Sequence, residues 1–307
     1  MYRTLSHVQL ITFSQYTIVY TEYLYVTMNS SNKSNITFTD EAFSLPTVIR
    51  ILAAIVVIEN AFAIFILIRS LQLPNNIRSL SICLACTDFS AGLLVLIPLS
   101  ILNSAVFCKI QLILATTVLM ASFLNISAIS MDMSASLMFP FRYGRLATAL
   151  FYKMVCLSLW FLGLLFGTIT FYGRNLNDTC SIPFNKSIGI QIQTYTLFAF
   201  VIWNIILYAY ISIVIRKKNR NVLNGTTGRR HIRQTLKLTA VVLTFIVCFL
   251  PHALLNVLLL TLEGEIYQQM LRIRKIGFAV VFLNSLLNPI LFVFRFRVCR
   301  YHAFTLL

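Results

Sequence analysis

Charged residues are scarce in this chain. Asp, Glu, Lys and Arg together make up 11% of the 307 residues, whereas about one quarter of an ordinary soluble domain is charged. Only 9 residues are acidic, and apolar residues make up 58% of the chain. This composition excludes an ordinary soluble domain, and the stretches between the apolar segments are too short to form a second one.

Histidine is also scarce, and the residues that catalysis needs do not gather. The four histidines are His7, His231, His252 and His302. None is grouped with a Ser or Cys nucleophile, and no metal-ligating pair has helical spacing. Cys83 and Cys86 form a C-x-x-C pair, but the pair lies in an apolar segment without a second pair. We therefore expect no enzyme and no catalytic residue.

Long apolar segments, by contrast, are abundant. Each of seven segments reaches the ~20 residues that cross a hydrocarbon core as a helix, and the third and sixth are long enough to extend beyond the membrane. The segments run from about Pro46 to Ser70, Ile77 to Leu102, Phe107 to Met138, Tyr152 to Tyr172, Ile188 to Ile215, Leu236 to Leu262 and Ile273 to Phe294.

These segments predict an all-α membrane protein, a seven-transmembrane helix bundle over residues 46–294. A tail over residues 1–45 precedes the bundle, and a short amphipathic cytoplasmic helix and tail over 295–307 follow it. A transporter or channel would be expected to contain inverted repeats or paired broken helices, and the sequence contains neither.

The distribution of basic residues predicts the orientation of the bundle. With the amino-terminus outside, the cytoplasmic connections and the carboxy-terminal segment hold 16 of the 25 Lys and Arg residues. The other side holds six of the nine acids. Because cytoplasmic loops carry an excess of Lys and Arg, we expect a multi-pass plasma-membrane protein with an extracellular amino-terminus. The net charge of +16 is attributed to topology and to contact with anionic membrane lipids, and no nucleic-acid binding is expected.

Glycosylation sequons fall on the predicted outer side. Five lie in the tail and in the connection before the fifth segment: Asn29, Asn32, Asn35, Asn177 and Asn185. Glycosylation occurs outside the cell, so a sixth sequon at Asn224, on the predicted inside, should stay unmodified. Residues 1–27 are apolar but interrupted by polar side chains, and we hypothesise that Met28 is the true start.

Three cysteines lie near the predicted membrane surfaces. Cys108 begins the third segment, and Cys180 lies in the connection before the fifth. Oxidising conditions outside the cell favour a disulfide between them, which would pin that connection across the mouth of the bundle. Cys299 follows the last segment, where palmitoylation at the inner leaflet and an unmodified thiol fit the sequence equally well.

Polar residues inside the apolar segments need partners. Asp88 falls in the middle of the second segment, where an unpaired ionised Asp would cost about 2.5–3.5 kcal/mol. Possible partners in the first, third and seventh segments are Asn60, Ser122, Asn284, Ser285 and Asn288. Carboxylate, hydroxyl and amide oxygens suit a small hard cation, but a network of interhelical hydrogen bonds without an ion fits the same residues.

Polar, aromatic and proline residues follow one another through the seven segments in an order that resembles the rhodopsin-like (class A) G-protein-coupled receptors. The resemblance covers about Pro46 to His302. The residues that carry it are Asn60, Asp88 in LACTD, Cys108 and Cys180, Trp160, Tyr210, Phe245, CFLP at 248–251 and NPILF at 288–292. One such residue or motif falls in almost every segment, so the resemblance is specific.

The resemblance implies a cell-surface receptor that transmits the binding of an extracellular ligand to a cytoplasmic partner by helix rearrangement. Pro251 and Pro289 would kink their helices and act as hinges. The family's sodium pocket corresponds to Asp88, Ser122, Asn284, Ser285 and Asn288. The resemblance therefore favours a structural sodium ion with Asp88 and Ser122 as ligands, and implies no other cofactor.

Several switch positions depart from the family pattern. The family has Asp-Arg-Tyr after the third segment, but here Asp132 is followed by Met133, which carries no charge. Phe292 replaces the tyrosine of N-P-x-x-Y and leaves Tyr210 without its family partner, and Phe249 replaces the family's tryptophan. The missing arginine and tyrosine put coupling to a G protein or arrestin in question. The alternative is a receptor-fold protein that does not activate G proteins, such as a decoy, scaffold or heteromer partner.

The ligand positions differ as well. Ala115 stands where amine receptors have an aspartate, so a monoamine is not expected, and Phe282 stands where opsins have the retinal-binding lysine. The outer mouth carries five charged residues, Glu263, Glu265, Arg272, Arg274 and Lys275. We expect a solvated surface turn there, although an acidic or lipid-like ligand could use the three basic residues.

Overall fold

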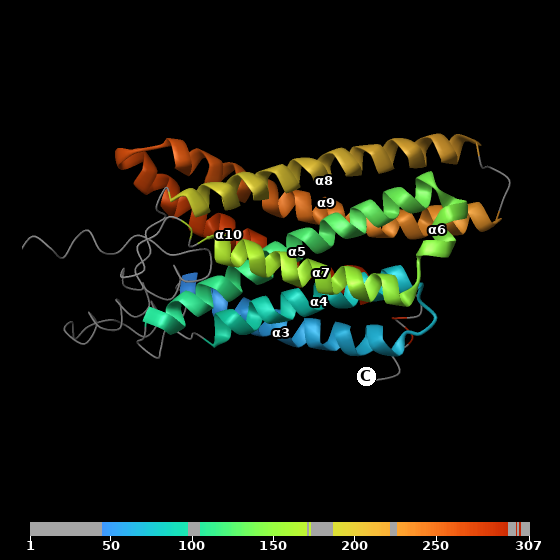
Figure 1. Cartoon of the computed structure of the whole chain (residues 1–307), viewed down its shortest axis with the longest axis horizontal. Coiled ribbons are helices and arrows are strands. Elements are labelled where there is room, and N and C mark those ends of the chain that lie inside the picture. Colours follow the sequence, from blue (N-terminus) through green and yellow to red (C-terminus); the bar gives the residue numbers. More distant parts are fainter. Residues whose placement is uncertain are drawn as a thin grey trace, which may run out of the picture.

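The computed structural model describes residues 45–97, 105–170, 172, 187–221, 226–293, 299 and 301. These residues form seven long helices and one short helix, and the long helices lie side by side (Figure 1). The helices are α3 (Leu45–Arg69), α4 (Asn75–Leu96), α5 (Ala105–Met138), α6 (Pro140–Leu146), α7 (Ala149–Ile169), α8 (Ile188–Asn221), α9 (Thr226–Thr261) and α10 (Gly264–Val293). The predicted all-α bundle is confirmed.

Three helices are longer than a membrane requires. At 1.5 Å per residue, the 34 residues of α5 and α8 span about 51 Å, against a hydrocarbon core of ~30 Å. The 36 residues of α9 span slightly more. The third and sixth segments therefore extend beyond the core as expected, and the fifth does so too, because α8 continues to Asn221.

Six of the described helices are long and apolar enough to cross a membrane, and α10 has a shorter apolar part, Val280–Leu291. The first turns of α10 carry charged residues such as Glu265 and Arg274, which lowers the mean hydropathy of this helix. α10 nevertheless has 30 residues, about 45 Å at 1.5 Å per residue, and packs against α9 and α3. It is the seventh membrane-crossing helix.

The two ends of the bundle differ (Figure 1). One end carries α6, which begins with Pro140, and is called the α6 end. The other carries the turn between α9 and α10 and is called the α9–α10 end. Gly264 adopts a φ of 66° in that turn, a conformation that glycine reaches without steric cost.

α5 is the central helix. It packs against α4, α7, α8 and α9, while α3 closes the bundle by packing on both α4 and α10. The side chains of α5 are mostly buried, whereas α7 and α8 bury only a minor share of theirs. The buried apolar core lies along α5 and includes Phe123, Ile126 and Phe245.

Close contact between α5 and α7 depends on two glycines one turn apart. A Cβ at Gly163 would lie 2.7 Å from the Thr117 carbonyl oxygen, and one at Gly167 would lie 2.5 Å from Thr117 Oγ1. Both distances are shorter than a van der Waals contact. The Gly-x-x-x-Gly spacing therefore lets the two backbones approach, as small residues do between membrane helices.

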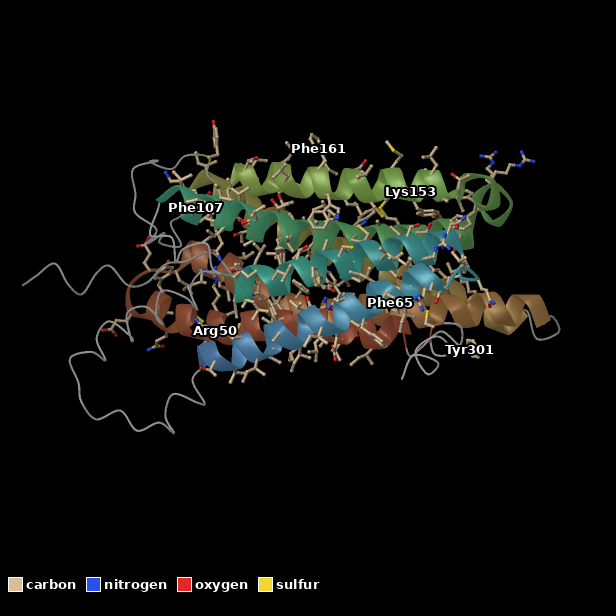
Figure 2. All side chains as sticks on the ribbon, turned by 90° about the horizontal axis from the view of Figure 1, so that it is seen from below. Arg50, Phe65, Phe107, Lys153, Phe161 and Tyr301 are labelled. Carbon is tan, nitrogen blue, oxygen red and sulfur yellow. The ribbon has the colours of Figure 1, made fainter. Side chains whose placement is uncertain are left out.

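The outer surface of the bundle is apolar. Large apolar side chains such as Ile58 on α3, Phe161 on α7 and Ile206 on α8 are more than half exposed, and Phe161 projects outward from the bundle (Figure 2). Arg69 lies over the ring of Phe65 at 4.2 Å, a favourable cation–π contact. Such a surface is expected where lipid is the solvent.

Candidate functional site

The carboxylate of Asp88 joins α4 to α10 inside the bundle. Asp88 is 1% exposed. Ser285 Oγ donates to Asp88 Oδ1 at 2.7 Å, and Asn288 Nδ2 donates to Asp88 Oδ2 at 2.8 Å. Each carboxylate oxygen thus accepts a hydrogen bond, which offsets part of the cost of burying it. Asp88 faces protein and not the lipid-facing surface.

Three asparagines on α3 and α10 have side-chain oxygens that lack a hydrogen-bond donor among the described residues. Asn60 Nδ2 donates to the Ser285 carbonyl oxygen at 3.2 Å and to the Val56 carbonyl oxygen at 2.9 Å. Within the described residues, the Oδ1 atoms of Asn60, Asn284 and Asn288 are buried and accept no hydrogen bond. Buried acceptors left without a donor are costly, so a group that binds oxygen would stabilise these residues.

Ser122 lies on α5 and is buried. Among the described residues, the donors to Asp88 are Ser285 and Asn288, and Ser122 is not one of them. Four of the five residues of the predicted pocket therefore lie on α4 and α10, which Asp88 connects. The fifth, Ser122, lies on the central helix α5. The role of Ser122 as a sodium ligand stays a prediction.

A second carboxylate, the partly buried Asp132, accepts hydrogen bonds from three residues at the α6 end. Asn76 Nδ2 of α4 donates to Asp132 Oδ2 at 2.8 Å, and the Tyr143 hydroxyl of α6 lies 2.8 Å from both carboxylate oxygens. The Tyr152 hydroxyl of α7 donates to Asp132 Oδ1 and lies 3.1 Å from the Tyr143 hydroxyl. Asn76 also donates to the Tyr143 hydroxyl at 2.8 Å. We call Asp132, Asn76, Tyr143 and Tyr152 the Asp132 cluster.

The Asp132 cluster contains no cationic member. Met133, which follows Asp132, is 3% exposed and belongs to the apolar core. Burial raises the pKa of the Tyr143 hydroxyl above its ordinary value, and the neighbouring Tyr152 and Asp132 raise it further. Tyr143 therefore stays protonated and able to donate at physiological pH. The sequence points to Asp132 as a switch residue and does not identify Asn76, Tyr143 or Tyr152 as its partners.

Phe245 and Phe249 form an aromatic cluster with Phe123 of α5. The ring centroids of Phe123 and Phe249 are 4.4 Å apart with planes at 74°, and those of Phe123 and Phe245 are 5.1 Å apart at 81°. Such edge-to-face pairs are favourable. The cluster lies just before Pro251, which α9 contains in its interior. Motion of α9 about that proline would have to repack these rings against α5.

The fifth membrane helix is joined to α5 by a polar contact that the sequence did not predict. Asn204 of α8 is fully buried, and its Nδ2 donates to Ser127 Oγ at 2.8 Å. Ser130 Oγ donates to Asn204 Oδ1 at 2.9 Å. Tyr210, one of the predicted switch residues, lies farther along α8 and is 37% exposed. Its hydroxyl makes no hydrogen bond to the described residues.

Other predicted sites are less fully described. Pro289 lies inside α10, but the side chain of Phe292 is outside the described residues, as are Cys180, the side chain of Cys108 and the five sequons. The Cys299 thiol is buried 3.7 Å from Ser70 Oγ, and burial raises its pKa. Palmitoylation of Cys299 stays a prediction that requires the thiol to leave this contact.

The expectation of a solvated turn at the α9–α10 end is wrong for Arg274. Arg274 is 3% exposed, whereas Glu263 and Glu265 are exposed. The side chains of Arg272 and Lys275 lie outside the described residues. Sequence reasoning placed all the charged residues in one turn, but α10 begins at Gly264, so Arg274 lies almost three turns inside a helix that packs against α9.

The comparisons with known proteins agree with this arrangement. The chain matches the 7 transmembrane receptor (rhodopsin family) over residues 59–292. It is 30% identical to the histamine H2 receptor of Cavia porcellus over 256 residues, which cover 72% of this chain and 68% of that receptor. It is 27% identical to the human adenosine receptor A2b over 76% of this chain and 79% of that receptor. The mouse lysophosphatidic acid receptor 6 is 28% identical over 64% and 62%.

The matched region contains both carboxylate clusters, the aromatic cluster and Pro251 and Pro289, and its relatives are receptors rather than enzymes. The signalling role of these relatives does not favour the alternative of a receptor-fold protein without G-protein activation. The chain therefore belongs to the rhodopsin family of seven-transmembrane receptors, the class A G-protein-coupled receptors.

Proposed function

We propose that this receptor lies in the plasma membrane with its α9–α10 end outside and its α6 end in the cytoplasm. The basic residues at the α6 end support this orientation. Arg142, Arg145 and Lys153 are exposed there, and Lys153 lies toward the same end of the bundle as Tyr301 (Figure 2). Cytoplasmic loops carry such an excess of Lys and Arg. An extracellular ligand would then bind at the α9–α10 end, and a heterotrimeric G protein at the α6 end.

The ligand is neither a monoamine nor retinal. Ala115 is fully buried on α5 and offers no carboxylate to an ammonium group. Phe282 is 2% exposed on α10 and has no amine to form a Schiff base. The relatives are named for histamine, adenosine and lysophosphatidic acid, which are three different chemistries, so their names do not choose a ligand for this chain.

The observation that carries the coupling proposal is the Asp132 cluster. Asp132 is bound to donors from α4, α6 and α7, so one carboxylate holds three elements of the cytoplasmic face together without an arginine. In the resting state this cluster keeps α6 closed against the bundle. Ligand binding would shift the equilibrium toward a state in which the cluster opens and the G protein binds.

A sodium ion at Asp88 is a second part of the proposal. The residues suit a small hard cation, because Asp88 is bound to Ser285 and Asn288 of α10, and the buried Oδ1 atoms of Asn284 and Asn288 on that helix accept no hydrogen bond among the described residues. Asp88, Asn284 and Asn288 would hold the ion, with Ser122 as the ligand from α5. The ion would supply positive charge that stabilises the resting arrangement of α4 and α10.

Nucleotide exchange tests the coupling proposal. Purified receptor in lipid nanodiscs is incubated with a panel of heterotrimeric G proteins, and binding of a non-hydrolysable GTP analogue is followed with empty nanodiscs as the control. Exchange on at least one G protein above that control is expected. Exchange that only the Met133→Arg variant can support would favour a receptor that does not couple. Glycosidase treatment of intact cells tests the orientation, since accessible glycans at Asn29 to Asn35 require an outside amino-terminus.

A further inference from the structure

Three thiols gather where α4 packs against α7. Cys83 and Cys86 lie one turn apart on α4, and Cys156 lies on α7. Cys83 is 5% exposed, whereas Cys86 and Cys156 are half-buried. All three are free thiols in this structure. The C-x-x-C pair of α4 is thus joined by a third thiol from a separate helix.

Cys156 contacts α4 at the turn that carries Cys83. Its Sγ donates to the Ser79 carbonyl oxygen at 3.6 Å. In a helix, that carbonyl oxygen also accepts from the N–H four residues later, which is the N–H of Cys83, and the side chain of Cys83 leans back toward it. The thiols of Cys83 and Cys156 are therefore neighbours, and they interact with each other. Cys86 lies a turn farther along α4 and interacts with Cys156 electrostatically.

The thiol pair lies next to the Asp132 cluster. On α7, Cys156 follows Tyr152 by one turn. On α4, Cys83 follows Asn76 by two turns. Asn76 and Tyr152 are the donors that α4 and α7 contribute to Asp132. A bond between the two cysteines would therefore fix the same two helices that the cluster joins.

The thiol pair lies close to the α6 end of the bundle. Cys156 is the eighth residue of α7, which places it about 10 Å from the start of that helix. Hydrogen peroxide is small and uncharged, so it can reach this depth from the α6 end. Among the residues that the structure describes, no group of three His, Cys, Asp or Glu side chains is placed to hold a metal ion. The chemistry that this cluster favours is therefore oxidation of one thiol by the other's neighbourhood to a peroxide.

We infer that Cys83 and Cys156 form a disulfide when the receptor meets a peroxide, and that this bond holds the receptor in its resting state. The inference rests on the proposed function, because the contact that it regulates is the Asp132 cluster. A disulfide keeps its two helices close together, so the donors Asn76 and Tyr152 stay near Asp132. A receptor with this bond exchanges nucleotide on its G protein more slowly.

The oxidation balances with hydrogen peroxide as the co-reactant. The more exposed thiol, Cys156, reacts first as the thiolate. Its sulfur attacks a peroxide oxygen, the O–O bond breaks, and a sulfenic acid and a water form. The Cys83 sulfur then attacks the sulfenic sulfur, and the leaving hydroxide takes the thiol proton to form a second water. The two sulfurs together lose two electrons, which the peroxide gains.

Mass spectrometry of the full-length receptor in nanodiscs tests the bond. The receptor is treated with hydrogen peroxide, the remaining thiols are blocked with N-ethylmaleimide, and the protein is digested. We expect a linked peptide pair that joins Cys83 to Cys156 and that dithiothreitol separates. Cys86→Ala is the matched control and should form the same pair, whereas Cys83→Ala should form no link between α4 and α7.

Nucleotide exchange and thermal stability test the consequence. The oxidised receptor should exchange nucleotide several-fold more slowly than the reduced receptor, and its unfolding temperature should be higher because the bond constrains the unfolded chain. Dithiothreitol should reverse both effects. In Cys83→Ala, peroxide should change neither quantity, which also controls for oxidation elsewhere in the chain. Cys156→Ala provides a second variant in case Cys83→Ala does not fold.

Three results would overturn the inference: no linked pair, a link that runs through Cys86 instead of Cys83, or an oxidised receptor that exchanges nucleotide as fast as the reduced one. The readouts separate this inference from the proposed function. A linked pair and a raised unfolding temperature in a receptor that activates no G protein would support the bond and contradict coupling. Nucleotide exchange without a linked pair would support coupling and contradict the bond.

Discussion

The Tyr143 hydroxyl lies 2.8 Å from both oxygens of the Asp132 carboxylate. In the family pattern the residue after this aspartate is an arginine, and here Met133 takes that place and packs into the core. The carboxylate is therefore held by neutral donors that come from three different helices. The contact ties α6, which a cytoplasmic partner would meet, to the central helix α5.

Tyr143→Phe should loosen α6. The substitution removes one donor to a charged acceptor, which costs about 1.5–3 kcal/mol when both groups are buried and less here because Tyr143 is only half-buried. Amide hydrogen exchange over residues 140–146, followed by mass spectrometry, should become faster. Tyr172→Phe, an exposed tyrosine at the opposite end, is the control. Unchanged exchange in α6 would show that Asp132 does not hold it.

Met133→Arg should destabilise the receptor and should not be needed for coupling. The position is 3% exposed, and Asp132 is already occupied by its donors, so the new guanidinium would be buried without a prepared partner. We expect a lower unfolding temperature than in Met133→Leu, which keeps an apolar side chain of similar volume. Equal stability of the two variants would mean that the new guanidinium pairs with Asp132 and displaces its neutral donors at no cost in stability.

Sodium should stabilise the wild-type receptor through Asp88. Replacing choline chloride by sodium chloride at constant ionic strength should raise the unfolding temperature, because the ion would bind the folded state. Asp88→Asn should lose this response. The Asp88→Asn substitution should also lower the free energy of unfolding in choline by about 1–3 kcal/mol. The reason is that the new amide nitrogen would face the Asn288 donor, or the hydrogen bond from Ser285 would be lost. A sodium response that persists in Asp88→Asn would place the ion elsewhere or exclude it.

Gly167→Ala should weaken the contact between α5 and α7. The added Cβ would lie 2.5 Å from Thr117 Oγ1 and 2.7 Å from the Ile113 carbonyl oxygen, so one helix must shift. A loss of about 1–3 kcal/mol is typical of such overpacking. Gly144→Ala is the matched control, because a Cβ there meets no atom within 4 Å. Its stability should equal or slightly exceed that of wild type, measured as the unfolding temperature in nanodiscs.

The bundle itself follows from the sequence, because six of the described helices are long and apolar enough to span a membrane and α10 adds a shorter apolar run. Asp88 could be located for the same reason, since a carboxylate in an apolar segment requires partners. Its contacts with Ser285 and Asn288 lie within the set of residues expected around it. The Gly163-x-x-x-Gly167 spacing in the sequence also predicts close helix packing.

The partners of Asp132 could not be predicted in the same way. They lie 56, 11 and 20 residues away from it, on separate helices, and asparagine and tyrosine at helix ends are ordinary surface residues. Only the packing of α4, α6 and α7 around α5 brings them together. Arg274 shows the opposite error, because its charged neighbours in the sequence suggested a solvated turn, whereas the early start of α10 places its guanidinium against α9.

The central claim is that Asp132 and its neutral donors hold the receptor at rest, and the basal nucleotide-exchange rate of Asp132→Asn tests it most directly. With equal amounts of receptor in nanodiscs and the G protein that wild type engages, Asp132→Asn should exchange nucleotide several-fold faster without ligand. A rate equal to or below that of wild type, in a variant that remains folded, would contradict the account.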